Sequence, residues 1–226
     1  NTTGTVPASK QIEIPEGKLF NLASTGYSEN NFASARIAVA EAIKVADAAS
    51  KRDGLISGIS TKFNSLDNLL GGFNNSDLII LAARPSMGKT ALALNFTLNA
   101  AEVLKKEYDE KLANFNKDPS NFNDEPQLGS VGFISLEMSA EQLATRLLSM
   151  ATGINASNIR RGNLSKTPSN DEFAKLVKAS SELNELPIFI DDTPALSISA
   201  VRTRARRLKR KHNLQFLLVD YLQLLQ

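Results

Sequence analysis

Eight consecutive residues, Ala83–Thr90, have the types and spacing needed to bind the phosphates of a nucleotide. They read A-R-P-S-M-G-K-T, a Walker A phosphate-loop pattern in which Ala83 stands where a glycine is usual. Gly88 lets the backbone approach an anion without a Cβ in the way. Lys89 would then meet the β and γ phosphates, and the Thr90 hydroxyl would bind Mg²⁺. The loop predicts only a nucleotide, since kinases, GTPases and motor ATPases share it, and a plain turn with Lys89 in solvent is the alternative. The predicted nucleotide-binding residues are Ala83, Arg84, Pro85, Ser86, Met87, Gly88, Lys89, Thr90 and Ala91.

Carboxylates at the ends of apolar runs could complete such a site. Phosphoryl transfer needs an acidic group on the metal and a group that orients the attacking water. Asp220 closes FLLVD, whereas Asp191 and Asp192 close PIFIDD, and chemistry alone does not separate these candidates for the metal. Glu137 ends VGFISLE and is the leading candidate for water activation if its strand is parallel to the one entering the phosphate loop. Each Asp could instead only cap a loop at the end of its strand, and Glu137 could be a solvated residue before a helix N-cap at Ser139.

Short apolar runs alternate with helical patterns through the main body, and these elements would position the site. The predicted strands are 78–83, 131–136, 187–190 and 215–219. The predicted helices are 90–106, 139–152, 171–183 and 197–212. Such alternation is typical of a mostly parallel sheet between helices, so the predicted fold class is α/β. The stretch 114–129, dense in Asn, Asp and Pro, is expected to form a surface excursion.

A separate region precedes this body. Residues 1–17 predict a flexible lead-in, and residues 18–53 a linker that contains an Ala-rich amphipathic helix over 31–50. That helix either packs on its own domain or docks on a neighbouring subunit, and its pattern leaves both open. The main body is expected to span 54–226. Because the chain opens at Asn1 without a signal-peptide pattern, we expect it to begin inside a longer protein.

Composition argues against a globally basic nucleic-acid binder, a membrane-spanning chain and a zinc protein. The 226 residues carry a net charge of +2, which does not indicate a globally basic nucleic-acid binder. No apolar run approaches the ~18 residues of a membrane span. The absence of cysteine and the single His212 argue against zinc chemistry.

Seven cations gather in 202–211, but Val201, Ala205 and Leu208 form an apolar stripe among them. This pattern favours the solvated face of a packed helix over a DNA-binding surface.

Several motifs together resemble those of DnaB-type bacterial replicative DNA helicases, over residues 17–226. AARPSMGKTALALN, FISLEMSAEQLATRLL, IFIDD followed by VRTRARRLKRKH, and LLVDYLQLL are similar to successive motifs of that family, in its order. LFNLASTGY and the helix after it resemble the interdomain linker. The resemblance implies a RecA-like P-loop ATPase core, preceded by a linker helix. It also implies assembly into a hexameric ring that encircles single-stranded DNA and unwinds the duplex ahead of a replication fork.

The same resemblance assigns roles that chemistry left open. LLVD matches the Walker B motif, so Asp220 is implied beside Thr90 as a magnesium ligand, and Asp191 becomes a structural neighbour. Glu137 matches the catalytic glutamate. Arg146 matches an arginine of the nucleotide site, although most such helix arginines only cover apolar surface with their stems. The implied catalytic residues are Lys89, Thr90, Glu137 and Asp220.

The resemblance also implies the ligands, partners and location. ATP and Mg²⁺ are the implied cofactors. The implied partners are single-stranded DNA, further copies of the chain that receive its linker helix, a primase and a helicase loader. The implied location is the bacterial cytoplasm at the nucleoid, without a membrane.

The sequence departs from the family's pattern in two places. The 114–129 excursion is longer than the family's connection, and the chain ends at Gln226, before the family's phosphate sensor, DNA-facing loops and finger residues. We therefore expect an incomplete ATPase domain. Two alternatives remain open: a RecA-like recombination or repair ATPase, and a docking or oligomerisation fragment with an idle nucleotide site.

Overall fold

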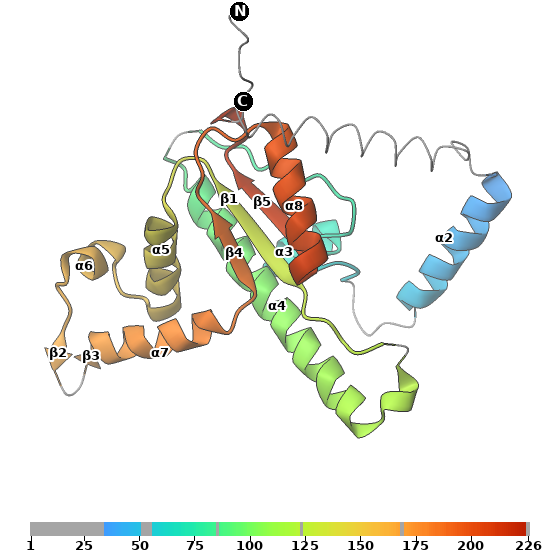
Figure 1. Cartoon of the computed structure of the whole chain (residues 1–226), viewed down its shortest axis with the longest axis horizontal. Helices are drawn as coiled ribbons and strands as arrows, with labels where there is room; N and C mark the ends of the chain where they lie inside the picture. Colours follow the sequence, from blue (N-terminus) through green and yellow to red (C-terminus); the bar gives the residue numbers. More distant parts are fainter. Residues whose placement is uncertain (1–33, 51–55, 85, 123, 168–169, 225–226) are drawn as a thin grey trace, which may run out of the picture. The chain divides into compact units, whose positions relative to one another are not determined.

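The computed structural model describes residues 34–50, 56–84, 86–122, 124–167 and 170–224 (Figure 1). The chain divides into two compact units, residues 1–53 and 54–226. In the first unit the predicted amphipathic helix is present as α2 (Ala35–Ser50), on which Val39 and Ile43 are 57% and 64% exposed. The predicted lead-in, the linker motif LFNLASTGY and the start of the predicted helix lie outside the described residues.

A three-stranded parallel sheet forms the centre of the second unit. Its strands are β4 (Ile188–Asp191), β1 (Ser130–Ser135) and β5 (Leu214–Asp220), in that order across the sheet. At its carboxyl end β1 pairs Ser135 with Asp220 on one side and Ile134 with Asp191 on the other. The three carboxyl ends therefore meet at one edge, as the sequence predicted for the carboxylates.

Helices connect and flank these strands (Figure 1). They are α3 (Asn64–Leu70), α4 (Lys89–Lys117), α5 (Ala140–Thr152), α6 (Ala156–Arg161), α7 (Glu172–Asn184) and α8 (Ile198–His212). The shorter elements are the 3-10 helices η1 (Pro119–Asn121) and η2 (Leu222–Leu224) and the antiparallel pair β2 (Lys166–Thr167) and β3 (Asn170–Asp171). Three predicted helices and three predicted strands are confirmed to within one residue at each end.

Local capping chemistry explains why these helices begin and end where they do. Ser139, Asp171 and Ser197 each accept a hydrogen bond from the backbone N–H three residues on, which satisfies a donor that the helix cannot. Gly153 ends α5 at φ 72° and Asn213 ends α8 at φ 49°, both in the left-handed conformation that stops a helix. The residues that begin α5, α7 and α8 and those that end α5 and α8 can therefore be recognised from short-range sequence signals.

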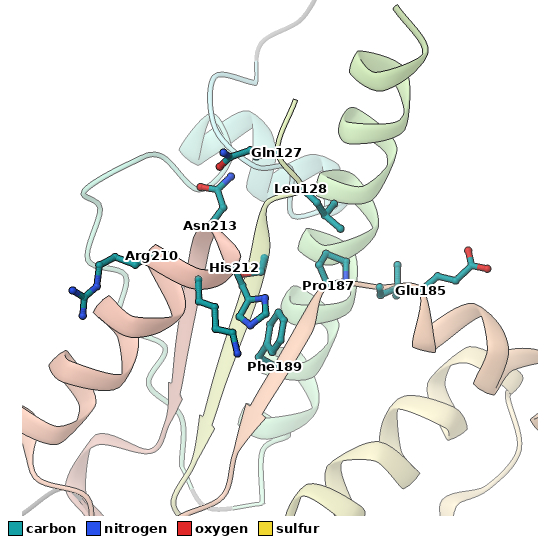
Figure 2. A pocket seen from close by; sticks show the side chains of 11 residues that line it. Gln127, Leu128, Glu185, Pro187, Phe189, Arg210, His212 and Asn213 are labelled. Carbon is teal, nitrogen blue, oxygen red and sulfur yellow. The ribbon is translucent and has the colours of Figure 1, made fainter. Parts of the chain in front are cut away.

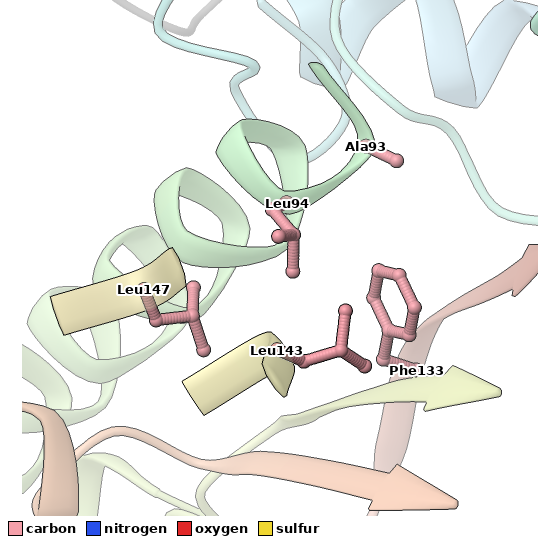
Figure 3. Close-up of a cluster of buried hydrophobic side chains, with 5 residues drawn as sticks. All are labelled: Ala93, Leu94, Phe133, Leu143 and Leu147. Carbon is pink, nitrogen blue, oxygen red and sulfur yellow. The ribbon is translucent and has the colours of Figure 1, made fainter. Parts of the chain in front are cut away.

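Alternate residues of β1 contact helices on opposite sides of the sheet. Phe133 packs in one buried cluster between α4 and α5 (Figure 3), and Val131 packs in a second cluster against α4. Gly132 lies between them and faces α8, because a Cβ built there would be 3.0 Å from Cδ2 of Leu208. Glycine therefore lets α8 approach the sheet closely. The first cluster consists of Ala93, Leu94, Phe133, Leu143 and Leu147.

The prediction of a strand over 78–83 is wrong. The described chain has no strand there, and Leu78 and Ile80 are 88% and 77% exposed. An apolar run indicates burial only if other segments cover it, and this run forms no ladder with the edge strand β5 among the described residues. The phosphate loop is thus entered from an exposed segment.

The expected surface excursion is also shorter than predicted. Helix α4 was predicted to end near residue 106 but continues to Lys117, and η1 follows it at Pro119. Ion pairs between residues four positions apart, such as Lys105 with Asp109, stabilise these additional turns, which contribute no buried residue to the core. Only the residues after η1 lead irregularly to β1.

A buried polar network holds the segment before the phosphate loop against α4. The Asp67 carboxylate accepts hydrogen bonds from the Ser60 hydroxyl, the Thr61 N–H and the Thr61 hydroxyl at 2.6–2.8 Å. The Asn99 side chain of α4 donates to the Thr61 carbonyl at 2.7 Å. Burial alone would raise the pKa of Asp67, but the hydrogen bonds outweigh it and lower the pKa. The carboxylate is therefore a structural anion.

Helices of membrane-spanning length and apolarity do not occur in the described part of the chain.

Candidate nucleotide site

Lys89 and Thr90, at the start of α4, meet Asp220 at the end of β5. The Thr90 hydroxyl donates a hydrogen bond of 2.7 Å to Oδ2 of Asp220, and Lys89 Nζ lies 3.4 Å from Oδ1. Asp220 is 3% exposed, so water screens these interactions weakly. The fold thus brings together three of the four predicted catalytic residues.

The loop before α4 is shaped to present backbone N–H groups to an anion. Gly88 precedes the helix at φ 85°, a backbone conformation that residues other than glycine rarely adopt. Ser86 also has a positive φ, of 64°. The first N–H groups of α4 have no partner within the helix, and they point toward the loop. Together with the positive end of the helix dipole they favour a phosphate at this position.

Most predicted loop residues are open to solvent. Ala83, Arg84, Ser86, Met87 and Gly88 are exposed, and Pro85 lies outside the described residues. Ala91, in the first turn of α4, is exposed as well. A ligand could reach all the described loop residues.

Glu137 lies two residues past the carboxyl end of β1, beside the end of β5. The Leu136 N–H donates to the Asp220 carbonyl at 2.8 Å, so the backbone that carries Glu137 is tied to the strand that carries Asp220. The Glu137 side chain is exposed and has no hydrogen bond or ion pair to another described residue. It shares the predicted edge with the loop, without a hydrogen bond or ion pair to Lys89 or Thr90.

The other two carboxylates considered for the metal are engaged elsewhere. Asp191 accepts hydrogen bonds from Thr193 and from the Arg204 guanidinium of α8. Burial would raise the pKa of Asp191, but these hydrogen bonds and the Arg204 charge lower it. Asp192 accepts a hydrogen bond of 2.8 Å from the Ala140 N–H, at the start of α5. The geometry therefore favours Asp220.

The other basic residues considered in the sequence lie on helices α5 and α8. Arg146 lies in the second turn of α5 and is exposed, without a hydrogen bond or ion pair to Lys89 or Asp220 in the described structure. On α8, Val201, Ala205 and Leu208 are partly buried while the cations between them are exposed. The apolar stripe predicted for this helix is confirmed.

Sequence reasoning missed one aromatic residue of the cluster. Lys89 Nζ lies 4.0 Å from the ring centroid of Tyr221, within the range of a cation–π contact. The signal was present, since Tyr221 directly follows Asp220, but an aromatic residue after a strand more often packs in a core. The ring and the Asp220 carboxylate together hold the Lys89 ammonium group.

A cavity of about 550 Å³ lies at the opposite edge of the sheet, at the amino ends of β1 and β4 (Figure 2). Ser130, Pro187, Phe189 and His212 are among the residues that line it, and the His212 ring lies 4.4 Å from that of Phe189. Figure 2 shows the Arg210 guanidinium directed away from His212. Because Lys89 and Asp220 lie at the carboxyl edge, this cavity is not the nucleotide site.

A family model and several curated proteins match this chain. The family "DnaB-like helicase C terminal domain" matches residues 58–226. The replicative DNA helicase DnaB of Rickettsia conorii is 49% identical over 226 residues, which cover 100% of this chain and 42% of that protein. The DnaB of Geobacillus stearothermophilus is 42% identical over 175 residues, covering 77% of this chain and 33% of that protein. The chain thus spans less than half the length of these curated relatives.

Two solved structures share the fold. One, described as an ATPase domain, superposes with a TM-score of 0.66 at 28% identity and covers 87% of this chain and 60% of that one. A structure described as a DnaB-like replicative helicase and its interactions with primase gives a TM-score of 0.64 at 28% identity, covering 96% of this chain and 46% of that one. The predicted α/β fold class with a RecA-like core is confirmed.

Proposed function

Because the chain belongs to the family of DnaB-like helicase C-terminal domains, we propose that it is the nucleotide-binding part of a helicase motor. This motor would use ATP hydrolysis to unwind duplex DNA at a replication fork. The observation that carries the proposal is the contact of Lys89 and Thr90 with Asp220, since a phosphate-loop lysine and hydroxyl beside a buried carboxylate form the core of an ATPase site.

The residues at this site fit ATP with Mg²⁺. Thr90 and Asp220 offer a hydroxyl and a carboxylate oxygen, the ligand type that Mg²⁺ prefers, and their separation of 2.7 Å allows both to reach one ion. The described chain has no group of three or more acidic or histidine residues that could hold a metal alone, so phosphate oxygens and water would supply the other ligands. Mg²⁺ bound there would offset negative charge on the phosphates.

Each side chain has a defined task in this proposal. Lys89 would leave Asp220 and bind the β and γ phosphates, while the N–H groups at the start of α4 hold their oxygens. Glu137 would accept a hydrogen bond from the attacking water and orient it toward the γ phosphate. Arg146 would lie near the nucleotide and stabilise its charge.

The partners are proposed from the same family. The relative solved with primase suggests a primase partner, and the exposed Val39 and Ile43 of α2 suit a helix that docks on a neighbouring copy in a hexameric ring. Single-stranded DNA inside the ring and a helicase loader complete the set. Such a motor would work on the bacterial chromosome in the cytoplasm.

An equilibrium titration tests the proposal directly. A fluorescent ATP analogue with Mg²⁺ is titrated against this chain, Lys89→Ala and Lys106→Ala, a control on the same helix whose side chain is 79% exposed. We expect the first variant to lose at least about 10-fold in affinity and the control to match the parent chain. Equal binding by all three proteins would contradict the proposed site.

The exposed Val39 and Ile43 of α2 favour one alternative, a docking fragment whose nucleotide site is idle. That alternative predicts that oligomer formation survives Lys89→Ala and is independent of nucleotide. Sedimentation of the parent chain and of this variant, with and without ATP, separates the two functions.

A further inference from the structure

The turn that carries Glu137 joins β1 to α5, and its backbone decides where the carboxylate can reach. The Glu137 side chain is exposed and has no hydrogen bond or ion pair to another described residue. Its direction therefore depends on how firmly Leu136–Ser139 is held. Catalytic groups lose efficiency when their support allows displacements of about 1 Å.

One side of this turn is anchored by β1 and β5. The Ser135 hydroxyl donates to the Met138 carbonyl at 2.7 Å and accepts from the Met138 N–H at 3.0 Å, so it closes the turn around Glu137. Ser135 is 1% exposed, which protects this clamp from water. On the same side the Leu136 N–H donates to the Asp220 carbonyl.

The other side is anchored by a single carboxylate from β4. Asp192 immediately follows that strand, and its Oδ2 accepts a hydrogen bond of 2.8 Å from the Ala140 N–H. Ala140 is the first residue of α5, where N–H groups lack helical partners and negative charge is favoured. The Ser139 capping box, in contrast, lies within α5 itself and ties the turn to no other strand.

We propose that Asp192 is a positioning residue for Glu137. It fixes the start of α5 against β4, while Leu136 fixes the other end of the turn against β5, so that the Glu137 carboxylate stays at the nucleotide edge. This inference rests on the proposed function, because it matters only if Glu137 orients the attacking water.

Three variants test the role of Asp192 in the complete polypeptide that carries this chain. Steady-state ATP hydrolysis should fall about 10-fold in kcat for Asp192→Ala, with KM within about twofold, because nucleotide contacts remain while the turn loosens. Asp192→Asn keeps an oxygen acceptor and should recover most of the loss. Asp171→Ala removes a matched carboxylate cap, at the Ala174 N–H of α7, and should leave kcat unchanged.

A second background separates positioning from a general structural effect. In Glu137→Gln, single-turnover hydrolysis should be slow, and adding Asp192→Ala should change it less than about twofold, because residues that act through one group are not additive. A similar 10-fold loss in both backgrounds, or an unchanged kcat in Asp192→Ala, would overturn the inference alone. Full hydrolysis by Glu137→Gln would overturn the proposed role of Glu137 and this inference together.

Discussion

The Thr90 hydroxyl donates a 2.7 Å hydrogen bond to Oδ2 of Asp220, although 130 residues separate the two in sequence. The other carboxylate oxygen faces Lys89, so one buried group links both loop residues to the end of β5. Removing one partner from such a cluster lowers stability by more than the net energy of the contact, because the remaining buried polar groups are left without hydrogen bonds or an opposite charge. Asp220 therefore has a structural role at the place where we propose that it binds Mg²⁺.

Asp220→Asn should weaken Mg²⁺ binding by at least about 10-fold, since it keeps the size of the side chain but removes the charge that attracts the ion. The measurement is a Mg²⁺ titration at fixed fluorescent ATP analogue, with EDTA as the end point. Asp109→Asn, an exposed carboxylate of α4 paired with Lys105, is the control. An unchanged Mg²⁺ midpoint in Asp220→Asn would exclude Asp220 as a ligand.

The sequence predicted the candidates for this cluster because they carry local signals, and the family resemblance, rather than chemistry, selected Asp220 over Asp191 and Asp192. Lys89 and Thr90 belong to a contiguous motif, and Asp220 closes an apolar run whose length indicates a strand. Helix bounds such as Ser139 were predictable for the same reason. These features depend on neighbours in the chain.

Features that depend on register between strands were not predictable. The segment PIFIDD does not indicate that Asp191 accepts a hydrogen bond from Arg204 while Asp192 accepts one from the Ala140 N–H. Those partners follow from the position of β4 beside β1. The run 78–83 shows the reverse case, in which an apolar pattern predicts burial but no described segment covers it. Both the hydrogen bonds of Asp191 and Asp192 and the exposure of residues 78–83 depend on which segments lie beside them in the fold.

Leu143→Ala should lower the free energy of unfolding by about 2–5 kcal/mol, because it opens a cavity in a close-packed cluster. Leu143 is fully buried between α4 and β1, against Leu94 and Phe133 (Figure 3). Leu69→Ala, at a side chain that is 79% exposed, should change stability by less than about 0.5 kcal/mol. Urea unfolding of the three proteins measures the difference, and equal midpoints for both variants would contradict the packing described.

Asp67→Asn should lower stability at neutral pH by about 1–3 kcal/mol and make it less sensitive to acid. The folded-state pKa of Asp67 is lowered, so its contribution is fully present above the unfolded value of about 3.9 and is lost as pH falls through the folded pKa. Unfolding free energies at pH 7 and pH 3 should therefore differ less in the variant than in the parent chain. Parallel pH curves would show that the network around Thr61 is not formed.

Gly58→Ala should destabilise the second unit by about 3 kcal/mol or more, through overpacking and lost hydrogen bonds. A Cβ at Gly58 would fall on the backbone carbonyl of Phe73, which cannot rotate aside as a side chain would. That strand-like contact carries two hydrogen bonds between Ile59 and Phe73, at 2.9 and 2.8 Å, and both would be strained. Gly153→Ala is the matched control: its Cβ meets open space, so only the left-handed backbone, at φ 72°, costs about 1–2 kcal/mol. If thermal unfolding ranked Gly153→Ala as the more damaging change, the close approach of residues 58 and 73 would be wrong.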